Sequence, residues 1–457
     1  MMRLSELAAA VGGELVGEDV LFTSVGTDSR NIVPGQLFIA LRGERFDGHA
    51  YVLQALQSGA AAALVAENVP GMAAGVVVKN TRLALGQLAA AWRNRFSIPV
   101  AAITGSNGKT TVKEMVASIL RAEAGDSNAV LATRGNLNND IGLPLTLLRL
   151  RPSHQYTVAE MGMNHFGEIR YLSQMARPTV ALVNNATSAH LGGLGSVEGI
   201  ARAKGEIFEG LALEGVAVIN ADDLYAPLWT ELAAEHDILT FGLAKMADVS
   251  ANYELRADSS YVYMKSPIGG VAFNLQVAGL HNVRNALAAS TVAIAMGARP
   301  ESIAQGLEAF DGVDGRLQHR AGIGQALVID DTYNANPASM KAAIDVLAAR
   351  PGKRLLVLGD MGELGETAAA MHTEIGQYAR EAGINGLYTL GELSLGMSKA
   401  FGDPAHHYKT PEQLVAGLCH EMDANTVVLV KGSRFMRMER VVQLIVSEQN
   451  NTKEEAH

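Results

Sequence analysis

The sequence predicts an α/β protein of three domains, and three observations support this prediction. A chain of 457 residues exceeds what one hydrophobic core usually organises, so it should divide into domains. Short apolar runs alternate with helical stretches over most of the chain, which is typical of largely parallel sheets covered by helices. A turn-like segment at residues 311–315 separates two such series. We therefore expect domains at residues 1–80, 81–313 and 314–457.

Composition and charge narrow the class of protein. Hydrophobic residues make up 48% of the chain and charged residues 18%, which suits globular domains with large cores. The formal net charge is -10, and the sequence has no run of basic residues, so neither nucleic acid nor anionic lipid is an expected partner. Cys419 is the only cysteine, which excludes an internal disulfide and a multi-thiolate metal site and favours a reducing compartment. No apolar window has the length of a membrane span, so we expect a cytoplasmic protein.

The first predicted domain is small and mixed in pattern. Turns rich in Gly, Asp and Pro separate short apolar runs, which are the expected strands: residues 37–41, 60–65 and 76–78. This arrangement indicates a small α/β domain.

The second domain begins with a helical pattern at residues 81–91 and a buried strand at residues 98–104. Further apolar runs then alternate with helical stretches. The expected strands are residues 156–159, 180–183 and 216–219, and the expected helices include residues 112–121 and 200–211. Alternation of this kind indicates a largely parallel sheet.

The third domain begins within residues 311–315, which we expect to act as a hinge. A new strand-helix series starts there, with strands predicted at residues 326–329 and 355–358. Such a series indicates a Rossmann-like domain. Residues 447–457 are polar and are expected to be frayed.

A glycine loop follows the strand at residues 98–104 and leads into a helix. Such a loop aims backbone N–H groups and a helix N-terminus at phosphate oxygens. Lys109 would reach the outer phosphates, and the hydroxyl of Thr110 would bind Mg²⁺. The loop is shorter than the full Walker pattern, because Ile103 stands where that pattern has a glycine, and an ordinary Gly-rich turn is the alternative. We expect a central P-loop ATPase domain that binds ATP through Gly105, Ser106, Asn107, Gly108, Lys109, Thr110 and Thr111.

Three further side chains of this domain could take part in chemistry. Glu160 ends an expected strand, where a carboxylate can reach a magnesium ion held over the loop, although a solvated acid is the alternative. His190 follows another apolar strand, and a lone histidine there is more often a hydrogen-bonded loop residue than a ligand. Lys204 shares a helical face with Ile200 and Ile207. It is therefore either an exposed lysine with its stem along apolar surface or a partly buried amine with a lowered pKa.

The shortened loop resembles that of the Mur ligase family, and further segments resemble the family along almost the whole chain. These segments are residues 27–30 (TDSR), 38–49, 331–337 (DTYNANP) and 359–365 (GDMGELG). The resemblance is greatest to the member that adds D-alanyl-D-alanine to the tripeptide carboxylate of UDP-N-acetylmuramoyl-tripeptide. It implies an ATP-dependent ligase of peptidoglycan synthesis, which works through an acyl phosphate and releases ADP and phosphate.

The resemblance also implies a catalytic and metal-binding set. Two magnesium ions would be held by Thr110, Glu160, His190 and Lys204, and CO₂ would carbamylate the lysine, turning a cation into a carboxylate. Lys109 and Arg316 would complete the catalytic set. Arg316 would reach the γ-phosphate from the hinge when the third domain closes, a task that suits an always-charged planar donor.

Two segments would build the nucleotide pocket. By resemblance, Asn282 would touch the nucleotide, with His281 and Asn285 shaping the pocket. Asp331 could accept hydrogen bonds from ribose hydroxyls, although a turn rich in Asn and Pro is the alternative. The residues expected around the base and ribose are Tyr333, Asn334 and Asn336.

The remaining expected contacts are with the UDP-sugar, the peptide and the dipeptide. In the first two domains the resemblance implies substrate contacts from Ser29, Arg30, Arg45, Asp47, Gly48, His49, Asn136, Asn138 and Asn139. In the third domain, Asp360, Glu363 and residues 431–434 would face the incoming dipeptide. Taken alone, each of these segments is typical of a polar turn.

Two other functions stay open. A sister Mur-type ligase would add a single amino acid, since the loop, Glu160, His190 and Lys204 are shared across the family. A P-loop ATPase would use ATP hydrolysis as a switch or motor, and only the glycine loop supports it. We expect a monomer in solution.

Overall fold

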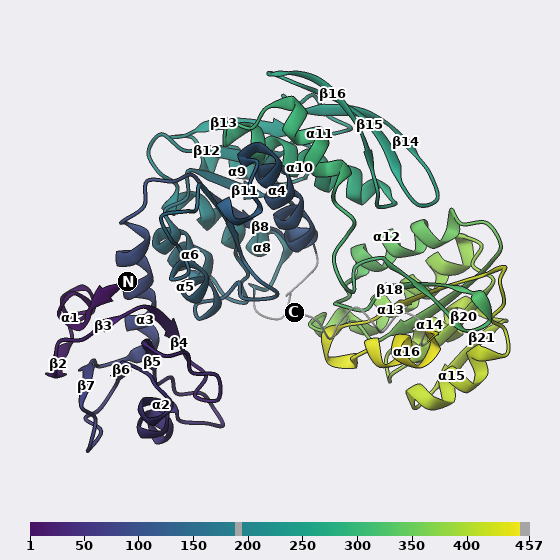
Figure 1. Ribbon diagram of the computed structural model, residues 1–457. Helices are drawn as coiled ribbons and strands as arrows, with labels where there is room; N and C mark the ends of the chain where they lie inside the picture. The colour runs from purple at the N-terminus through teal and green to yellow at the C-terminus, as the bar shows by residue number, and fades with distance from the viewer. Residues whose placement is uncertain (188–193, 448–457) are drawn as a thin grey trace.

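The first sheet of the protein is small and lies near the N-terminus. The computed structural model describes residues 1–187 and 194–447 (Figure 1). The five strands of this sheet are β2 (Glu14–Gly17), β7 (Ala74–Val77), β6 (Ala62–Val65), β5 (Gln36–Ile39) and β4 (Ser24–Gly26), in that order. Beside it lie β1 (Met2–Arg3), β3 (Leu21–Phe22), α1 (Leu4–Val11) and α2 (Val52–Gln57). The predicted small α/β arrangement is confirmed.

The second sheet is parallel throughout and has six strands. Their order is β13 (Asp237–Phe241), β12 (Val216–Asn220), β11 (Val180–Val183), β8 (Val100–Thr104), β10 (Tyr156–Glu160) and β9 (Val130–Ala132). The chain runs from β8 to β9 on one side and from β10 to β11 on the other. Ligands of open parallel sheets bind at such a switch point, beyond the carboxyl ends of the strands.

Helices cover both faces of the second sheet, because alternate residues of each strand point to opposite faces. Ala101 and Ile103 of β8 pack toward one helical layer, and Ala102 packs toward the other. The first layer contains α4 (Lys109–Ala124), α10 (Leu280–Ala295) and α11 (Pro300–Glu308). The second contains α3 (Thr81–Arg93), α5 (Gly142–Leu147), α6 (Glu168–Ala176), α8 (Val197–Gly205) and α9 (Ala226–Leu232).

Two features of this part differ from the sequence prediction. The helix expected at residues 200–211 is α-helical only as far as Gly205 and continues as a 3-10 segment, in which the Glu206 carboxylate accepts hydrogen bonds from the Gly167 amide at 2.9 Å. An antiparallel sheet was not predicted. It consists of β14 (Ser250–Leu255), β15 (Ser260–Ser266) and β16 (Gly269–Leu275) and packs on α10 and α11.

The third sheet has the expected Rossmann-like layering. Its order is β17 (Gln318–Ala321), β18 (Leu327–Asp331), β22 (Thr426–Lys431), β19 (Lys353–Gly359), β20 (Gly386–Leu390) and β21 (Ala405–Tyr408), and only β17 is antiparallel to its neighbour. The covering helices are α12 (Pro337–Ala348), α13 (Ala368–Glu381), α14 (Ser394–Phe401), α15 (Pro411–Cys419) and α16 (Glu439–Ile445). The 3-10 segments of the chain are η1 (Gly48–Tyr51), η2 (Ser127–Ala129), η3 (Glu206–Gly210), η4 (Ile323–Gln325), η5 (Gly365–Thr367) and η6 (Arg434–Met436).

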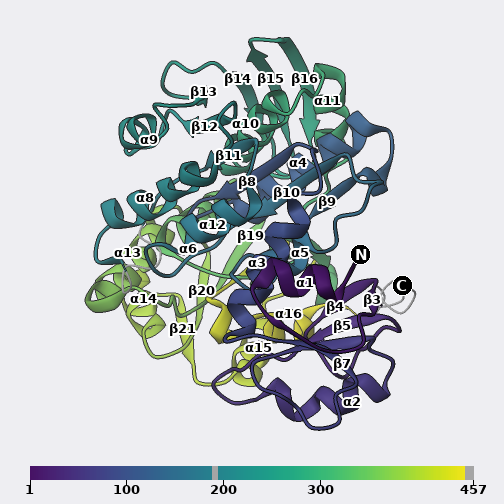
Figure 2. The same ribbon diagram turned by 90° about the vertical axis from the view of Figure 1, so that its left-hand side faces the viewer.

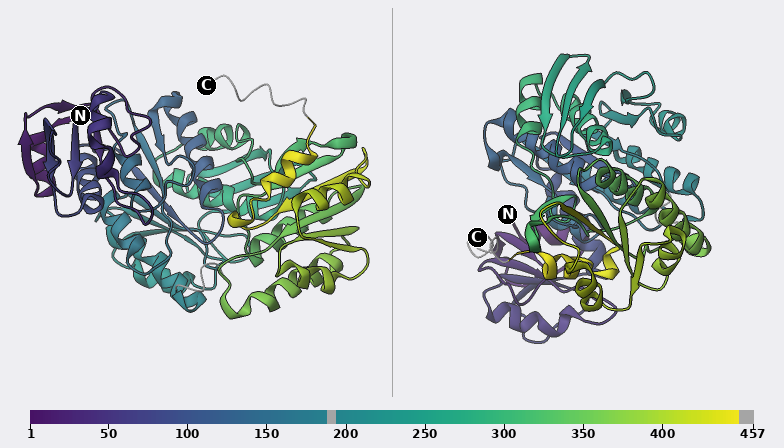
Figure 3. Two further views of the ribbon diagram at one scale, coloured as in Figure 1. Left: turned by 90° about the horizontal axis from the view of Figure 1, so that it is seen from below. Right: turned by 90° about the vertical axis from the view of Figure 1, so that its right-hand side faces the viewer.

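The second part of the chain, which contains the six-stranded parallel sheet, lies between the other two (Figure 3). The first part contains the five-stranded sheet, and the third part contains the sheet of β17–β22. Helix α3 joins the first part to the second, since it contacts α1 on one side and α5 and α6 on the other (Figure 2). The second and third parts meet beside the N-terminal end of α4. No helix within residues 1–187 or 194–447 is long and apolar enough to cross a membrane.

Candidate active site at the phosphate loop

The predicted phosphate loop lies between β8 and α4, and tertiary contacts hold it in shape. The amide of Asn107 donates to Oδ1 of Asn185 at 2.8 Å, and Nδ2 of Asn184 donates to the Asn107 carbonyl at 3.0 Å. Gly108 has φ +78°, and a Cβ there would lie 2.4 Å from Oδ1 of Asn285. Only glycine fits this position without displacing its neighbours.

The loop is suited to bind an anion. Helix α4 has 16 residues, and no side chain of residues 1–187 or 194–447 caps its N-terminus at Gly108. Its first N–H groups and the positive end of its dipole therefore face the loop. Lys109 donates from Nζ to the Gly105 carbonyl at 2.7 Å. Burial lowers the pKa of this lysine, the Glu160 carboxylate raises it, and the Arg316 guanidinium lowers it.

A cavity of about 350 Å³ opens on one side of the loop. Glu160 and Lys204 line it, together with the predicted substrate residues Asn136, Asn138 and Asn139. Nδ2 of Asn138 donates to Oε1 of Glu160 at 2.8 Å. The other oxygen, Oε2, is buried and finds no hydrogen-bond partner in the described part of the chain.

Lys204, which lines this cavity, is buried and has a lowered pKa. It is only 2% exposed, and its pKa lies well below the ordinary value, first because of burial and then because of the charge of Lys109. An amine of this kind has a larger neutral fraction and can react with an electrophile such as CO₂.

The residues around Glu160 fit a divalent cation. A buried carboxylate oxygen without a donor is a hard ligand of the kind that Mg²⁺ prefers. No group of three His, Cys, Asp or Glu that could hold a metal is present among the residues the structure describes, so a cation here would need other ligands as well. Thr110 lies in the first turn of α4, directly after the phosphate loop, and Lys204 lines the smaller cavity beside that loop. His190, the remaining predicted ligand, lies outside the described residues.

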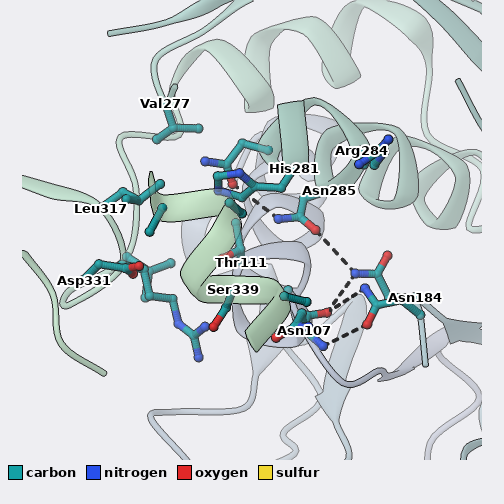
Figure 4. Close-up of a pocket in the computed structure, with 18 of the residues that line it drawn as sticks. Asn107, Thr111, Asn184, Val277, His281, Arg284, Asn285, Leu317, Asp331 and Ser339 are labelled. Atoms are coloured by element: carbon teal, nitrogen blue, oxygen red, sulfur yellow. Dashed lines mark hydrogen bonds between the residues drawn. The ribbon is translucent and has the colours of Figure 1, made fainter. Parts of the chain in front are cut away.

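A larger cavity of about 450 Å³ opens on the other side of the loop (Figure 4). A chain of amides lines it: Asn184 donates to Oδ1 of Asn285 at 3.4 Å, and Asn285 donates to Oδ1 of Asn282 at 3.3 Å. His281 also points into it, and burial, assisted by the charges of Lys431 and Arg284, lowers the pKa of this histidine to about 4. The imidazole is therefore neutral near pH 7 and can both donate and accept a hydrogen bond.

The two cavities meet at the phosphate loop. The residues that line both are Asn107, Gly108, Arg316, Asp331, Ser339 and Lys431. Two of these belong to the loop, and the other four come from the third part of the chain. The loop therefore faces one cavity on each side, and the third part closes the junction.

Arg316, which directly follows the predicted hinge at residues 311–315, contacts the start of α4 beside the phosphate loop. Its Nη2 donates to the hydroxyl of Thr110 at 3.0 Å, and its guanidinium lies 4.3 Å from the ring centre of Tyr333. The predicted metal ligand Thr110 is thus engaged by a cationic donor, which uses one of the two acceptor lone pairs of its hydroxyl oxygen. Nε of Arg316 is buried without a partner among residues 1–187 and 194–447.

Residues of the third part complete the junction. Nζ of Lys431 lies 2.6 Å from Oδ2 of Asp331 and donates to the carbonyl of Asn334 at 2.9 Å. Nδ2 of Asn336 donates to Oδ1 of Asn107 at 2.7 Å, while Oδ1 of Asn336 caps α12. The structure therefore brings Asp331, Asn336 and the loop together, and it pairs Asp331 with a lysine.

The predicted residues of the first part lie away from this junction. Arg30 forms a paired contact with Asp28, with both distances 2.8 Å. Asp47 accepts from the amide of His49 at 2.9 Å and starts η1. None of the described residues Ser29, Arg30, Arg45, Asp47, Gly48 and His49 lines either cavity.

Asp360 and Glu363 also lie apart from both cavities, within the described chain. The Asp360 carboxylate accepts from the amide of Ser394 at 2.7 Å and from that of Leu393 at 3.2 Å, at the start of α14. Glu363 is exposed and has φ +62°. The structure thus shows a helix-supporting role for Asp360, and a contact of either residue with the dipeptide stays a prediction.

Three segments of the chain match Mur ligase domains. Residues 21–93 match the Mur ligase family catalytic domain, residues 103–293 the Mur ligase middle domain, and residues 315–434 the Mur ligase glutamate ligase domain. The chain belongs to the Mur ligase family.

Relatives of this Mur ligase match over nearly its full length. The UDP-N-acetylmuramoyl-tripeptide–D-alanyl-D-alanine ligase of Escherichia coli K12 is 42% identical and covers 97% of this chain and 98% of the relative. A crystal structure of MurF from Acinetobacter baumannii is 38% identical, with a TM-score of 0.91 over 97% of this chain and 98% of that one. The MurF ligase of Thermotoga maritima in complex with ADP is 29% identical, with a TM-score of 0.83 over 93% of this chain and 98% of that one.

Several residues of the Mur ligase site were missed by sequence reasoning. Asn184 directly follows β11, and Asn220 ends β12, so both lie at the same sheet edge as the loop. Their positions at the carboxyl ends of apolar strands were a usable signal. Asp222 and Asp223 also line the larger cavity, and Glu168 the smaller one.

Proposed function

We propose that this Mur ligase joins D-alanyl-D-alanine to the tripeptide carboxylate of UDP-N-acetylmuramoyl-tripeptide, with conversion of ATP to ADP and phosphate. The relative from Escherichia coli bears the name of this activity and aligns with 97% of the chain. The product would be the pentapeptide precursor of peptidoglycan, made in the cytoplasm by a monomer.

The junction of the two cavities carries this proposal. The larger cavity, with its amide chain and neutral His281, suits a purine nucleoside. The smaller one, whose lining includes Glu160, Lys204 and several asparagines, suits a polar acceptor. The phosphate loop lies between them, so a γ-phosphate on the loop would face a carboxylate that enters from the smaller cavity.

The chemistry requires an activated carboxylate, because amide formation from a free carboxylate is uphill at neutral pH. The tripeptide carboxylate would attack the γ-phosphorus, forming an acyl phosphate as ADP leaves. The amine of D-alanyl-D-alanine would then attack the acyl carbon through a tetrahedral intermediate, and phosphate would leave. Closure of the third part over the loop would keep water from the acyl phosphate.

The residues of the chain would act by position and charge. Lys109 and Arg316 would hold the phosphate oxygens on which negative charge develops. Magnesium would be held by Thr110, Glu160, His190 and carbamylated Lys204, and it would supply further neutralisation of the phosphates. Two observations support this ligand set: Oε2 of Glu160 is buried with no partner among the described residues, and the pKa of Lys204 is lowered.

We further propose a division of labour along the chain. Residues 1–80 would bind the UDP-sugar through Ser29, Arg30, Arg45, Asp47, Gly48 and His49. Residues 81–313 would bind ATP and the peptide, and residues 314–457 would close the site and bind the dipeptide near Asp360 and Glu363. Asn282, Asp331, Tyr333 and Asn336 would complete the nucleotide site.

A phosphate-release assay tests the proposal. The enzyme is given ATP, Mg²⁺ and UDP-N-acetylmuramoyl-tripeptide, and D-alanyl-D-alanine is compared with single amino acids as the acceptor. We expect phosphate release that requires both substrates, with a pentapeptide product detected by mass spectrometry. A Lys109→Met variant serves as the control for release by contaminating phosphatases.

The alternatives give different results in the same assay. Stimulation by a single amino acid, and none by the dipeptide, would identify a sister ligase. ATP turnover that needs neither substrate would identify a P-loop switch. Either result would contradict the proposed activity.

A further inference from the structure

Lys113 is a fully buried lysine that the chemistry above does not use. It lies on α4, one turn after Lys109, and its exposed fraction is 0%. Burial of an ammonium group is costly unless polar partners surround it. Nζ of Lys113 donates to the carbonyl of Thr133 at 2.7 Å and also contacts the carboxylate of Glu114. The lysine is thus tied to the segment that follows β9.

Thr133 connects this lysine to the end of β10. The Thr133 hydroxyl accepts a hydrogen bond from the amide of Glu160 at 3.0 Å, and the Thr133 amide donates to the carbonyl of Val158 at 3.0 Å. Thr133 is itself 1% exposed. Thr133 therefore accepts two hydrogen bonds: its carbonyl accepts from Lys113, and its hydroxyl accepts from the backbone amide of Glu160.

The same segment also holds the side chain of Glu160. Asn138, five residues after Thr133, donates from Nδ2 to Oε1 of Glu160 at 2.8 Å, and its carbonyl accepts from the amide of Gly162 at 2.9 Å. One carboxylate oxygen and the backbone amide of Glu160 are thus fixed from residues 133–138. The other oxygen, Oε2, is buried and has no hydrogen-bond partner in the described chain.

We propose that Lys113 is a positioning residue that anchors residues 133–138 and thereby orients Glu160 to bind a divalent cation beside the nucleotide. It acts through Thr133 and touches neither the substrate nor the cation. Without the ammonium, the carbonyl of Thr133 loses its buried donor, and the segment that holds both ends of Glu160 can shift. The inference rests on the proposed function for the choice of a metal–nucleotide complex as the ligand.

Binding of Mn²⁺ tests this inference without measuring turnover. Free Mn²⁺ is followed by electron paramagnetic resonance in titrations of the enzyme with saturating ADP. Outer groups that orient metal ligands typically contribute 10- to 100-fold to metal affinity, so K113M should bind Mn²⁺ about 10- to 100-fold more weakly than wild type. T133V, which lacks the hydroxyl that holds Glu160, should show a loss of the same order. Binding of a fluorescent ADP analogue in EDTA should be unchanged in both variants.

A double variant and a matched control separate positioning from general damage. If Lys113 acts on Glu160 through Thr133, the two losses should not add. The Mn²⁺ affinity of K113M/T133V should then lie within about twofold of that of the single variant with the lower affinity. Val116 is fully buried on the same helix, so V116A should lower the urea midpoint but keep the wild-type affinity for Mn²⁺.

Several outcomes would overturn the inference. These are wild-type Mn²⁺ affinity in K113M, additive losses in the double variant, or an equal loss of affinity in V116A. If K113M does not fold, wild-type affinity in T133V is the deciding result against it. Failure of the wild-type enzyme to bind Mn²⁺ with ADP would instead refute the proposed nucleotide site itself.

Discussion

Replacement of Arg316 by alanine should lower turnover without weakening the binding of the UDP-linked substrate. The guanidinium lies beside the phosphate loop, 3.0 Å from the Thr110 hydroxyl and 4.3 Å from the ring centre of Tyr333. It lines both cavities. From this position a small shift would bring it to a phosphate oxygen on the loop.

The size of the effect follows from the kind of contact that is lost. A hydrogen bond between charged groups contributes about 1.5–3 kcal/mol, which corresponds to about 10- to 150-fold in rate if it forms in the transition state. The contact with Tyr333 is worth about 0.5–2 kcal/mol, but it exists before the reaction and should not change kcat. We therefore expect R316A to lower kcat by about 10- to 150-fold. The kcat of R316K should lie between those of the wild type and R316A, because lysine keeps the charge but not the planar donor.

The assay couples ADP release to NADH oxidation, with each substrate varied in turn. KM for UDP-N-acetylmuramoyl-tripeptide should stay within about twofold of the wild-type value, since only the transition state loses a contact. Arg256 provides a matched control: it pairs with Glu254 at 3.1 Å, is exposed, and lies in a turn of the antiparallel sheet. R256A should have wild-type kinetics. Equal ADP release by R316A and wild type, or a loss confined to KM, would refute the role given to Arg316.

Three further predictions concern Lys204, His281 and Asp360. Because burial lowers the pKa of Lys204, its neutral amine should take up CO₂ near neutral pH: ¹³C NMR with labelled bicarbonate should show a carbamate that K204M lacks, and K204M should lose at least about 100-fold in kcat. A folded pKa of about 4 for His281, below its ordinary 6.5, means that protons favour the unfolded chain, so stability should fall by at most about 3 kcal/mol as pH drops from 6.5 to about 4. Urea midpoints of H281Q should be less pH-dependent across that window, and an unchanged slope would contradict this assignment. Loss of the contacts at the start of α14 should cost D360A about 2 kcal/mol in urea unfolding, and an unchanged KM for D-alanyl-D-alanine would then exclude a dipeptide contact.

Strands and the phosphate loop were predictable because their signals are local. The expected strand at residues 180–183 is β11, and the apolar run that ends in Gly105 is β8 with its loop. The antiparallel sheet at residues 250–275 was not predicted. In β15, Val262 and Met264 are buried while Tyr261, Tyr263 and Lys265 are exposed, so the strand alternates and has no long apolar run.

The helix expected at residues 200–211 shows where local pattern is insufficient. Its apolar spacing continues to Phe208, yet the α-helix ends at Gly205. Glu206 accepts hydrogen bonds from the amide of Gly167, which belongs to the turn before α6. The segment that follows the helix is thus tied to a residue 39 positions away, a contact that local spacing does not reveal.

The sequence by itself determined the α/β class, the glycine loop between a strand and a helix, and the family, since the motifs behind each consist of residues close together in the chain. Only the tertiary structure decided which distant groups meet. Arg316 reaches Thr110 across 206 residues, and Asn336 reaches Asn107 across 229. It also showed that Asp360 accepts a hydrogen bond at the start of α14 and that Lys113 donates to the carbonyl of Thr133. Such contacts depend on how sheets and helices pack and on how the hinge places the third part, and the spacing of residues along the chain does not encode these directly.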